Sequence, residues 1–363
     1  MTPSTTANKP LALAGIRGNA ALLIVLALLV LLPFVIGVLD GQSIAGVLTS
    51  KEGNSKFYQG LLIEIFILGI YAISYDLLFG VTGLLSFGHA MFFAVGAYLT
   101  GIALKTLHLS LLPTLGLVIV AGIAQALLFS IVLPRVKGIT FALVTLGMAS
   151  VFHIVIVSHE LNPLTGGDVG LQNIPKPVFL NPSAERLTFY FVALFALFAF
   201  YLIFRRFVNS PTGRVCTAIR ENEDRAKMLG YNTFYFKLAA LILSGITAAL
   251  AGALQALYQP IVSPNSAGLG FTVAALLMIL IGGVGTLSGA LVGAAAYRLL
   301  DFFLNKAFGE SSSFLLGVVY VVLVLFVPYG IVGTWQLRQN DIRAGWRRLT
   351  QPLRGAGEEG KVL

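Results

Sequence analysis

Long apolar runs separated by short polar stretches make up most of the chain. Ten such runs lie at residues 20–39, 57–80, 84–104, 111–133, 139–158, 188–204, 237–258, 271–284, 287–304 and 314–334. Nearly all of them reach the roughly 17 to 25 residues with which a helix crosses about 30 Å of hydrocarbon. Because a backbone inside lipid must satisfy its own hydrogen bonds, the pattern predicts an all-α polytopic membrane protein with about ten transmembrane segments.

The run at residues 271–284 is the weakest of the ten, because its fourteen residues are short for a crossing. It ends at the sequence Gly-Gly-Val-Gly, residues 282–285, where we divide a longer apolar stretch into two segments. A half-helix that dips into the membrane is the alternative, since irregular backbone is tolerated there when it lines a cavity or is buried in protein. The sequence leaves both interpretations open.

A second glycine-rich break, Gly-Val-Thr-Gly, occupies residues 80–83. The two breaks form a weak internal repeat of two halves, because Gly-Leu-Leu-Ser at 83–86 corresponds to Gly-Thr-Leu-Ser at 285–288. A stretch with several Ala and Gly residues follows each break, at 90–97 and 290–296. Broken helices at corresponding places in two halves point to the substrate path of a transporter. The alternative is that both are packing seams, where small residues let helices approach closely.

Composition supports the membrane class, and the charges indicate an orientation. Of the 363 residues, 57% are hydrophobic and 11% charged, against about 25% charged in soluble domains, and the mean hydropathy is +0.89. The net charge of +9 does not indicate nucleic acid, because 17 of the 24 Lys and Arg lie in the short stretches 1–19, 134–138, 205–237 and 335–363. Such basic stretches stay in the cytoplasm. We therefore expect cytoplasmic tails at 1–19 and 335–363 around a transmembrane domain at 20–334, with both termini inside.

Residues 205–237 form the longest polar stretch between two apolar runs, with seven basic and three acidic residues. Ser210 followed by Pro211 predicts the start of a short helix. Asn222 predicts the start of a second one, with acidic residues in its first turn and Gly230 at its end. We therefore expect a compact helical knob, residues 205–237, on the cytoplasmic face of the membrane.

Four motifs resemble those of branched-chain amino acid permeases in ABC importers. Residues 80–90 (GVTGLLSFGHA) resemble the signature G-Y-T-G-L-L-S-L-G-H, and residues 164–171 (LTGGDVGL) resemble the external loop L-T-G-G-x-x-G-L. Residues 213–222 (GRVCTAIREN) resemble G-R-x-x-x-A-I-R-E-N. Residues 224–230 (DRAKMLG) resemble E-A-A-x-x-x-G, the loop by which such permeases grip their ATPase, although Asp and Arg replace the Glu and the first Ala. The resemblance covers about residues 57–334 and is closest to the methionine-named partner of a two-permease pair.

The resemblance implies a permease subunit of an ATP-driven importer for branched-chain or other hydrophobic amino acids. Such a chain spans the bacterial inner membrane, in contact with membrane lipid. Its implied partners are a second homologous permease, two ATP-binding cassette subunits and a periplasmic or lipid-anchored substrate-binding protein. ATP and magnesium would bind to the cassette subunits, so we expect no cofactor and no metal on this chain.

Three sets of candidate functional residues result from the breaks and the motifs. The substrate path is expected at Asp76, Thr82, Gly83, Ser86, Gly88, His89, Gly285 and Ser288. Coupling to the ATPase is expected at Arg220, Glu221, Asn222, Glu223, Asp224, Arg225, Ala226 and Gly230. Docking of the binding protein is expected on the loop from Asn162 to Arg186, above all at Thr165, Gly166, Gly167 and Asp168.

Asp76 and His89 bring distinctive chemistry to the first break. A carboxylate within a span costs at least about 2.5 to 3.5 kcal/mol and usually faces a cavity or a partner, so Asp76 is suited to receive a substrate ammonium. His89 follows Ser86 by three residues, near a helix N-terminus whose free N–H groups suit a substrate carboxylate. The alternative is a histidine satisfied by a neighbouring backbone carbonyl. Glu64, on the same predicted helix as Asp76, is expected near the outer interface.

Other functions stay open or are disfavoured. Asp76 stands where amino acid permeases of this family usually have Asn and urea importers often have Asp, so a urea or short-amide importer is the first alternative. The second is an ion-coupled secondary transporter or channel, against which the knob and the scarcity of membrane carboxylates argue. No enzyme motif is found: the chain has no H-E-x-x-H, no G-x-S-x-G and a single cysteine, Cys216. Residues 355–361 resemble a phosphate-binding loop, but Val362 replaces its Ser or Thr.

Overall fold

The computed structural model describes residues 11–41, 54–183, 185–327 and 329–335. Helices account for about four-fifths of these residues. The strands among them are β1 (Leu171–Gln172) and β2 (Ile261–Val262), which pair antiparallel. The all-α architecture predicted from the sequence is confirmed, whereas the tails predicted at 1–19 and 335–363 lie largely outside the described residues.

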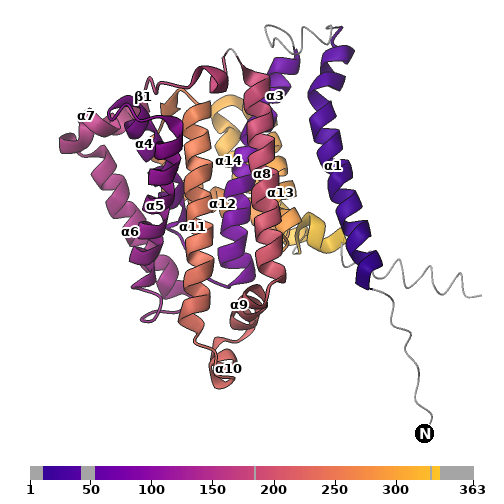
Figure 1. The fold of residues 1–363 in the computed structure, drawn as a ribbon, viewed down its shortest axis with the longest axis vertical. Coiled ribbons are helices and arrows are strands. Elements are labelled where there is room, and N and C mark those ends of the chain that lie inside the picture. Colours follow the sequence, from indigo (N-terminus) through magenta and orange to yellow (C-terminus); the bar gives the residue numbers. More distant parts are fainter. Residues whose placement is uncertain (1–10, 42–53, 184, 328, 336–363) are drawn as a thin grey trace, which may run out of the picture. The chain divides into compact units, whose positions relative to one another are not determined.

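Ten apolar helices within the described residues correspond to the ten predicted runs (Figure 1). They are α1 (Leu11–Leu39), α3 (Asn54–Tyr75), α4 (His89–Lys105), α5 (Leu111–Ser130), α6 (Ile139–Val157), α8 (Arg186–Asn209), α11 (Thr233–Tyr258), α12 (Leu269–Gly282), α13 (Leu287–Phe308) and α14 (Ser312–Phe326). Seven of them are long and apolar enough to cross a membrane, whereas α4, α12 and α14 are shorter. The number of crossings therefore stays a prediction.

Short helices occupy the connections. They are the π-helical η1 (Asp76–Val81), the 3₁₀ helices η2 (His159–Leu161), η3 (Gly167–Val169), η4 (Val178–Leu180), η5 (Pro264–Ala267) and η6 (Gly309–Ser311), and the α-helices α7 (Asn162–Thr165), α9 (Pro211–Glu221) and α10 (Glu223–Met228). The helices α9 and α10 form the predicted knob, which Figure 1 shows between the ends of α8 and α11.

The chain divides into two compact units. The first comprises residues 1–63 and 178–192, and the second comprises residues 64–177 and 193–363. In the first unit, a hydrogen bond joins α8 to α1: the Tyr190 hydroxyl donates to Leu29 O at 2.6 Å. Every candidate site residue described below belongs to the second unit, apart from the part of the external loop that lies in the first.

Glycines set the helix spacing in the second unit, where α11 packs against α4 and α5, and α12 packs against α13. A Cβ at Gly96 of α4 would overlap the backbone of Ala249 in α11, and one at Gly293 of α13 would overlap the Met278 carbonyl in α12. The stretches after the two breaks therefore pack closely against neighbouring helices, and whether the breaks line a substrate path stays a prediction.

The helices α3 and α13 lie side by side and run antiparallel. Three contacts join them in order: Glu64 with Arg298, Gly69 with Leu291, and Asp76 with Gly285 just before α13. Residue numbers rise along α3 as they fall along α13, which fixes the antiparallel direction. The two glycine breaks consequently lie at the same end of this helix pair.

Candidate functional site

The two glycine breaks are in direct contact. The Gly285 N–H donates to Asp76 Oδ1 at 2.7 Å. A Cβ at Gly80 would lie 2.5 Å from the Gly285 nitrogen and would overlap the Asp76 carboxylate, so only glycine allows this approach. The weak repeat in the sequence thus corresponds to two loops that form one junction, which we call the break junction (Asp76, Gly80, Gly83, Gly285 and Arg220).

Local backbone geometry explains why the junction needs these residues. After Tyr75 the helix α3 widens into the π-helical turn η1, which places the Asp76 side chain against the second break. Such π-helical turns often occur at functional sites. Gly83 and Gly285 both have φ of +78°, a left-handed conformation that side-chain-bearing residues rarely adopt.

Arg220, near the end of α9, connects the knob to both breaks. Its Nη1 donates to the Gly80 carbonyl. Its stem covers Gly83, where a Cβ would lie 3.0 Å from Arg220 Cγ, and its guanidinium lies beside Gly285. One side chain predicted to couple to the ATPase therefore contacts residues of the predicted substrate path in both breaks.

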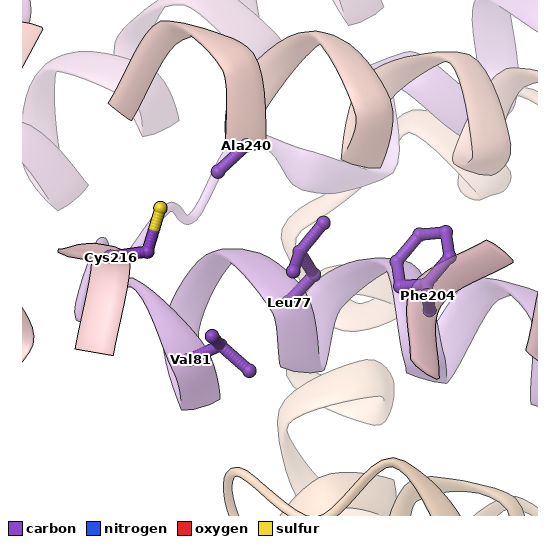
Figure 2. Packing of buried hydrophobic residues seen from close by; sticks show 5 residues of the cluster. All are labelled: Leu77, Val81, Phe204, Cys216 and Ala240. Atoms are coloured by element: carbon purple, nitrogen blue, oxygen red, sulfur yellow. The ribbon is translucent and has the colours of Figure 1, made fainter. Parts of the chain in front are cut away.

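A buried apolar cluster holds the knob helix α9 against η1. Its members are Leu77 and Val81 of η1, Phe204 of α8, Cys216 of α9 and Ala240 of α11. Figure 2 shows Cys216 and Leu77 pointing toward the helix that carries Ala240. Burial raises the pKa of the Cys216 thiol to about 11. Because side chains from four helices interdigitate here, a displacement of α9 must displace the first break.

The helix limits predicted for the knob are confirmed. Ser210 Oγ accepts from Gly213 N at 3.2 Å, and Asn222 Oδ1 accepts from Arg225 N at 2.9 Å, so both predicted residues cap their helices. Gly230 has φ of +87° and ends α10. Two backbone bonds close this end, from Gly230 N to Lys227 O and from the following residue to Ala226 O, which is the Schellman arrangement.

Glu223 is the electrostatic centre of the knob. Its carboxylate binds Lys237 Nζ at 2.7 Å and Lys227 Nζ at 3.2 Å, and it accepts from Thr233 Oγ1 at 3.0 Å. Burial alone would raise the pKa of Glu223, but the hydrogen bond and charge of Lys237, with help from Thr233 and Lys227, hold it at about 2. Asp224, the next residue, makes an exposed pair with Lys137 at 3.0 Å. Glu223 therefore fixes α10 to the start of α11.

The remaining predicted coupling residues lie on the surface of the knob or beneath it. Glu221 and Arg225 are exposed, and Ala226 is buried. The tip adds two apolar side chains that were not predicted: Met228 and Leu229 are 86% and 73% exposed. An apolar tip on a polar loop is typical of a surface that contacts another protein.

His89 lies fully buried at the start of α4. Its Nε2 shares a 2.9 Å hydrogen bond with Ser74 Oγ, and Tyr71 stacks on the ring with centroids 5.4 Å apart. The partner of His89 is thus a hydroxyl and not the backbone carbonyl of the alternative interpretation. Ser86 is also buried, and its carbonyl accepts from Tyr75 at 3.1 Å.

The amides near this helix start are not free. The Ala90 N–H donates to Thr272 Oγ1 at 3.0 Å, and the Phe87 N–H donates to Thr145 Oγ1 at 3.2 Å. The expectation that these groups wait for a substrate carboxylate is wrong for both, because hydroxyls of α12 and α6 already occupy them. Gly88 lies between Phe87 and Ala90 in the sequence, and a Cβ at this position would overlap the Thr145 carbonyl.

The predicted path residues differ in their exposure within this chain. Asp76, Ser86 and His89 are fully buried, and Thr82 is nearly so, with its hydroxyl donating to Leu77 O at 3.0 Å. Ser288 is exposed at the start of α13, as is Gly83. Their role in a substrate path stays a prediction.

The external loop predicted to dock a binding protein folds on itself. Thr165 is buried and donates to Ile156 O at 2.7 Å, whereas Asp168 is exposed next to Val169. Gly166 and Gly167 have φ of +78° and +55°, so the tight turn depends on glycine. The exposed surface of the loop includes Asp168 and Val169, as well as Asn162, Pro163 and Leu164.

Arg298 was not among the residues predicted from the sequence. It lies on α13 and pairs with Glu64 at 2.5 Å and with Asp301 at 2.9 Å. Glu64 is therefore part of an ion pair between α3 and α13, and its position relative to the outer interface stays a prediction. A signal was present, because Arg and Asp three residues apart inside an apolar run are rare in membranes and tend to be functional.

Comparison with known proteins places the chain among permeases. The family described as branched-chain amino acid transport system / permease component matches residues 57–327. The high-affinity branched-chain amino acid transport system permease protein LivM of Salmonella typhimurium is 27% identical over 287 residues, which cover 72% of this chain and 67% of that protein. LivM of Escherichia coli (strain K12) has the same identity and coverage.

A second kind of permease is also similar. The high-affinity branched-chain amino acid transport system permease protein LivH of Salmonella typhimurium is 25% identical over 288 residues, which cover 73% of this chain and 90% of that protein. No solved structure is significantly similar to the chain. The family match spans most of the sequence and includes all four motifs, and the chain therefore belongs to the permease component family of branched-chain amino acid transport systems.

Proposed function

We propose that the chain is the permease subunit of an ATP-driven importer of branched-chain or other hydrophobic amino acids. The observation that carries the proposal is the contact of Arg220 with the Gly80 carbonyl, which joins the knob directly to the break junction. A permease driven by a separate ATPase needs such a connection between its cytoplasmic surface and its substrate path. The names of its relatives support amino acids as the substrate class.

In this mechanism the ATPase subunits grip the knob and the break junction responds. The exposed Met228 and Leu229 offer the apolar contact, and Glu223 keeps α10 rigid on α11 through its bond to Lys237. A push on α10 would move α9, and Arg220 with the apolar cluster would transmit the movement to η1. No step requires covalent chemistry from this chain, and ATP hydrolysis is assigned to the partner subunits with their magnesium.

The partners and the orientation belong to the same proposal. The chain would pair with a second homologous permease, which is supported by its similarity to two different permeases of one organism, LivM and LivH. A periplasmic or lipid-anchored binding protein would dock on the external loop around Asp168. The pair would sit in the bacterial inner membrane with both termini and the knob in the cytoplasm.

A urea or short-amide importer is the second candidate, and Asp76 is the observation that favours it. In the structure this carboxylate caps the Gly285 N–H, a role that needs an oxygen acceptor but no charge. Asn at this position would keep the acceptor. Replacing Asp76 by Asn therefore separates the two substrates, because a zwitterionic amino acid brings an ammonium that benefits from the charge and urea does not.

Uptake by reconstituted complexes tests the substrate. We would measure labelled leucine and labelled urea with the unmodified chain, with Asp76→Asn and with His89→Ala. The proposal expects ATP-dependent leucine uptake that Asp76→Asn weakens more than any urea uptake. Import of urea but not leucine by the unmodified complex would establish the second candidate instead. Leucine uptake untouched by both changes would remove the first break from the substrate path.

Coupling is tested at Arg220, with a matched arginine on the same helix. Arg220→Ala should lower ATP-driven leucine uptake by about tenfold or more, because it removes a charge-assisted hydrogen bond worth about 1.5 to 3 kcal/mol. Arg214, like Arg220, is an exposed arginine of α9, but the bond to Gly80 comes from Arg220, so Arg214→Ala should leave uptake near normal. If both variants transport equally well, the junction does not couple the knob to the path.

A further inference from the structure

Three charged side chains form a cluster between α3 and α13. Arg298 Nε and Nη2 contact Glu64 Oε2 at 2.5 Å, and Arg298 Nη1 donates to Asp301 Oδ2 at 2.9 Å. Asn305 Nδ2 donates to Asp301 Oδ1 at 3.0 Å. One positive and two negative groups leave the cluster, Glu64, Arg298 and Asp301, with one uncompensated negative charge.

The cluster lies deep along the helices. Glu64 is ten residues from the first residue of α3, and Arg298 is ten residues from the last residue of α13, which at 1.5 Å per residue is about 15 Å from either end. That depth is about half of a 30 Å hydrocarbon layer. The break junction joins the same two helices at one end, 12 residues beyond Glu64 along α3, so the cluster lies near the middle of the pair and about 18 Å from the junction.

A surface position at this depth restricts what the cluster can face. The side chains of Glu64, Arg298 and Asp301 are 20%, 23% and 34% exposed within this chain. Charged groups at membrane depth face a bundle interior or a water-filled cavity rather than lipid. The exposed sides of these three groups must therefore point to water, to a substrate or to a second protein.

A cavity lined in part by Tyr297, the neighbour of Arg298 on α13, favours a substrate. It measures about 470 Å³, within the usual range of ligand pockets, and it opens beside β2 and η5 between α4, α11, α12 and α13. Phe93, Phe271 and Tyr297 give it an aromatic wall, and Gln255 and Asn265 add amides. Tyr297 also joins the cavity to the cluster, because it precedes Arg298 and lies one turn from Asp301 on α13.

We propose that this cluster receives the charged head of an amino acid near the middle of the substrate path, while the aromatic wall receives its apolar side chain. Arg298 has five N–H donors, of which its two carboxylate partners use three, so two remain to donate to a substrate carboxylate. The uncompensated negative charge suits the ammonium. This inference rests on the proposed import of amino acids and specifies the site that recognises their zwitterionic head.

Neutralising the whole cluster distinguishes a binding site from a structural ion pair. The variant Glu64→Gln, Arg298→Gln and Asp301→Asn keeps the shapes but removes all three charges, a change that ion pairs serving only stability commonly tolerate. The inference expects an assembled complex of normal thermal stability whose leucine uptake falls by about tenfold or more, the effect of losing one charge-assisted contact. Uptake within twofold of the unmodified complex would overturn it.

A second measurement keeps the test decisive if that variant fails to assemble. Tyr297→Cys in a Cys216→Ala chain places one thiol of this subunit at the cavity, and a charged methanethiosulfonate reports its contact with water. The inference expects labelling that slows about fivefold or more with leucine-loaded binding protein. Phe303→Cys lies at an exposed apolar position of α13 that we expect to face lipid, which excludes the charged reagent, so it should stay unlabelled. A thiol introduced in place of Tyr297 that is inert, or whose labelling leucine does not change, contradicts the inference.

The unmodified complex separates this inference from the proposed function. If it imports no leucine, the proposed function fails and the inference fails with it. If it imports leucine and the neutral variant imports it equally well, only the inference fails. Both outcomes are read in the same uptake assay.

Discussion

Replacing Glu223 by Gln should loosen the knob and weaken transport. The carboxylate holds the Lys237 ammonium at 2.7 Å, and the Lys237 side chain is only 7% exposed. Gln keeps the size of the side chain and one oxygen acceptor but removes the charge. The Lys237 ammonium would then be largely buried without its counterion, and α10 would lose its main link to α11.

The magnitude can be bounded in two ways. Removing one partner of a fully buried ion pair costs about 3 to 5 kcal/mol, and removing an exposed pair costs about 0 to 1 kcal/mol. Glu223 is 18% exposed, which places it between these limits. Its pKa of about 2, against 4.5 for an ordinary Glu, corresponds to at most about 3 kcal/mol before solvent screening is allowed for. We expect a loss of about 2 kcal/mol.

The same pKa fixes the pH dependence. Because the folded chain lowers the pKa of Glu223, its contribution to stability is complete above about pH 4.5 and is lost as the pH falls toward 2. The Glu223→Gln chain should lack this part of the acid transition. At neutral pH the stability of the unmodified chain and that of the Glu223→Gln chain should differ by the full amount, about 2 kcal/mol.

Limited trypsin digestion of the full-length chain in detergent measures the effect locally. A loss of about 2 kcal/mol raises the open population of the knob by about 30-fold, and cleavage after Arg225 or Lys227 should accelerate to match. Asp224→Asn is the matched control, because the side chains of Asp224 and Lys137 are 70% and 57% exposed. Loss of this pair should accelerate cleavage by less than about fivefold. Equal acceleration by the two variants would refute the reasoning, as would the absence of rescue when Lys237→Met is added to Glu223→Gln.

Three further outcomes are expected. Gly80→Ala should abolish most leucine uptake, because its Cβ would overlap the Asp76 carboxylate and the Gly285 nitrogen, whereas Gly116→Ala, with open space around it, should transport normally. A reporter active only in the periplasm should be active when fused after Gly170 and silent after Cys216 or after Gly345, which lies outside the described residues; activity after Gly345 would contradict the even number of crossings. Cys216 should resist N-ethylmaleimide between about pH 7 and 9 until the chain is denatured, because burial raises its pKa to about 11, and rapid labelling of the native chain would show that the apolar cluster opens.

Features encoded within a few residues were predictable from the sequence. Ser210 and Asn222 lie at the helix starts that their types favour, and Gly230 lies at the end of α10 with the left-handed φ that its position requires. The ten apolar helices follow the apolar runs, since length and hydropathy are local properties.

Contacts between distant segments were not predictable in this way. Nothing in the local pattern indicates that the Arg220 guanidinium reaches Gly80, 140 residues away, or that Glu64 meets Arg298 across 234 residues. The Ala90 amide is a similar case. The sequence predicts free N–H groups at the start of α4, but the Ala90 N–H donates to the hydroxyl of Thr272 in α12. Such pairings depend on how the helices pack, which periodicity does not specify.

The two-residue ladder of β1 and β2 connects the loop that carries Asp168 to the rim of the cavity. β1 follows directly after the loop with Asp168 and Val169, and β2 forms part of the rim of the 470 Å³ cavity. Gly170 lies so close to Val262 that a Cβ would overlap its carbonyl, so the two strands cannot slide independently. If a binding protein docks on this loop, as we propose, its contact would also move the rim of the cavity, because the ladder joins the two.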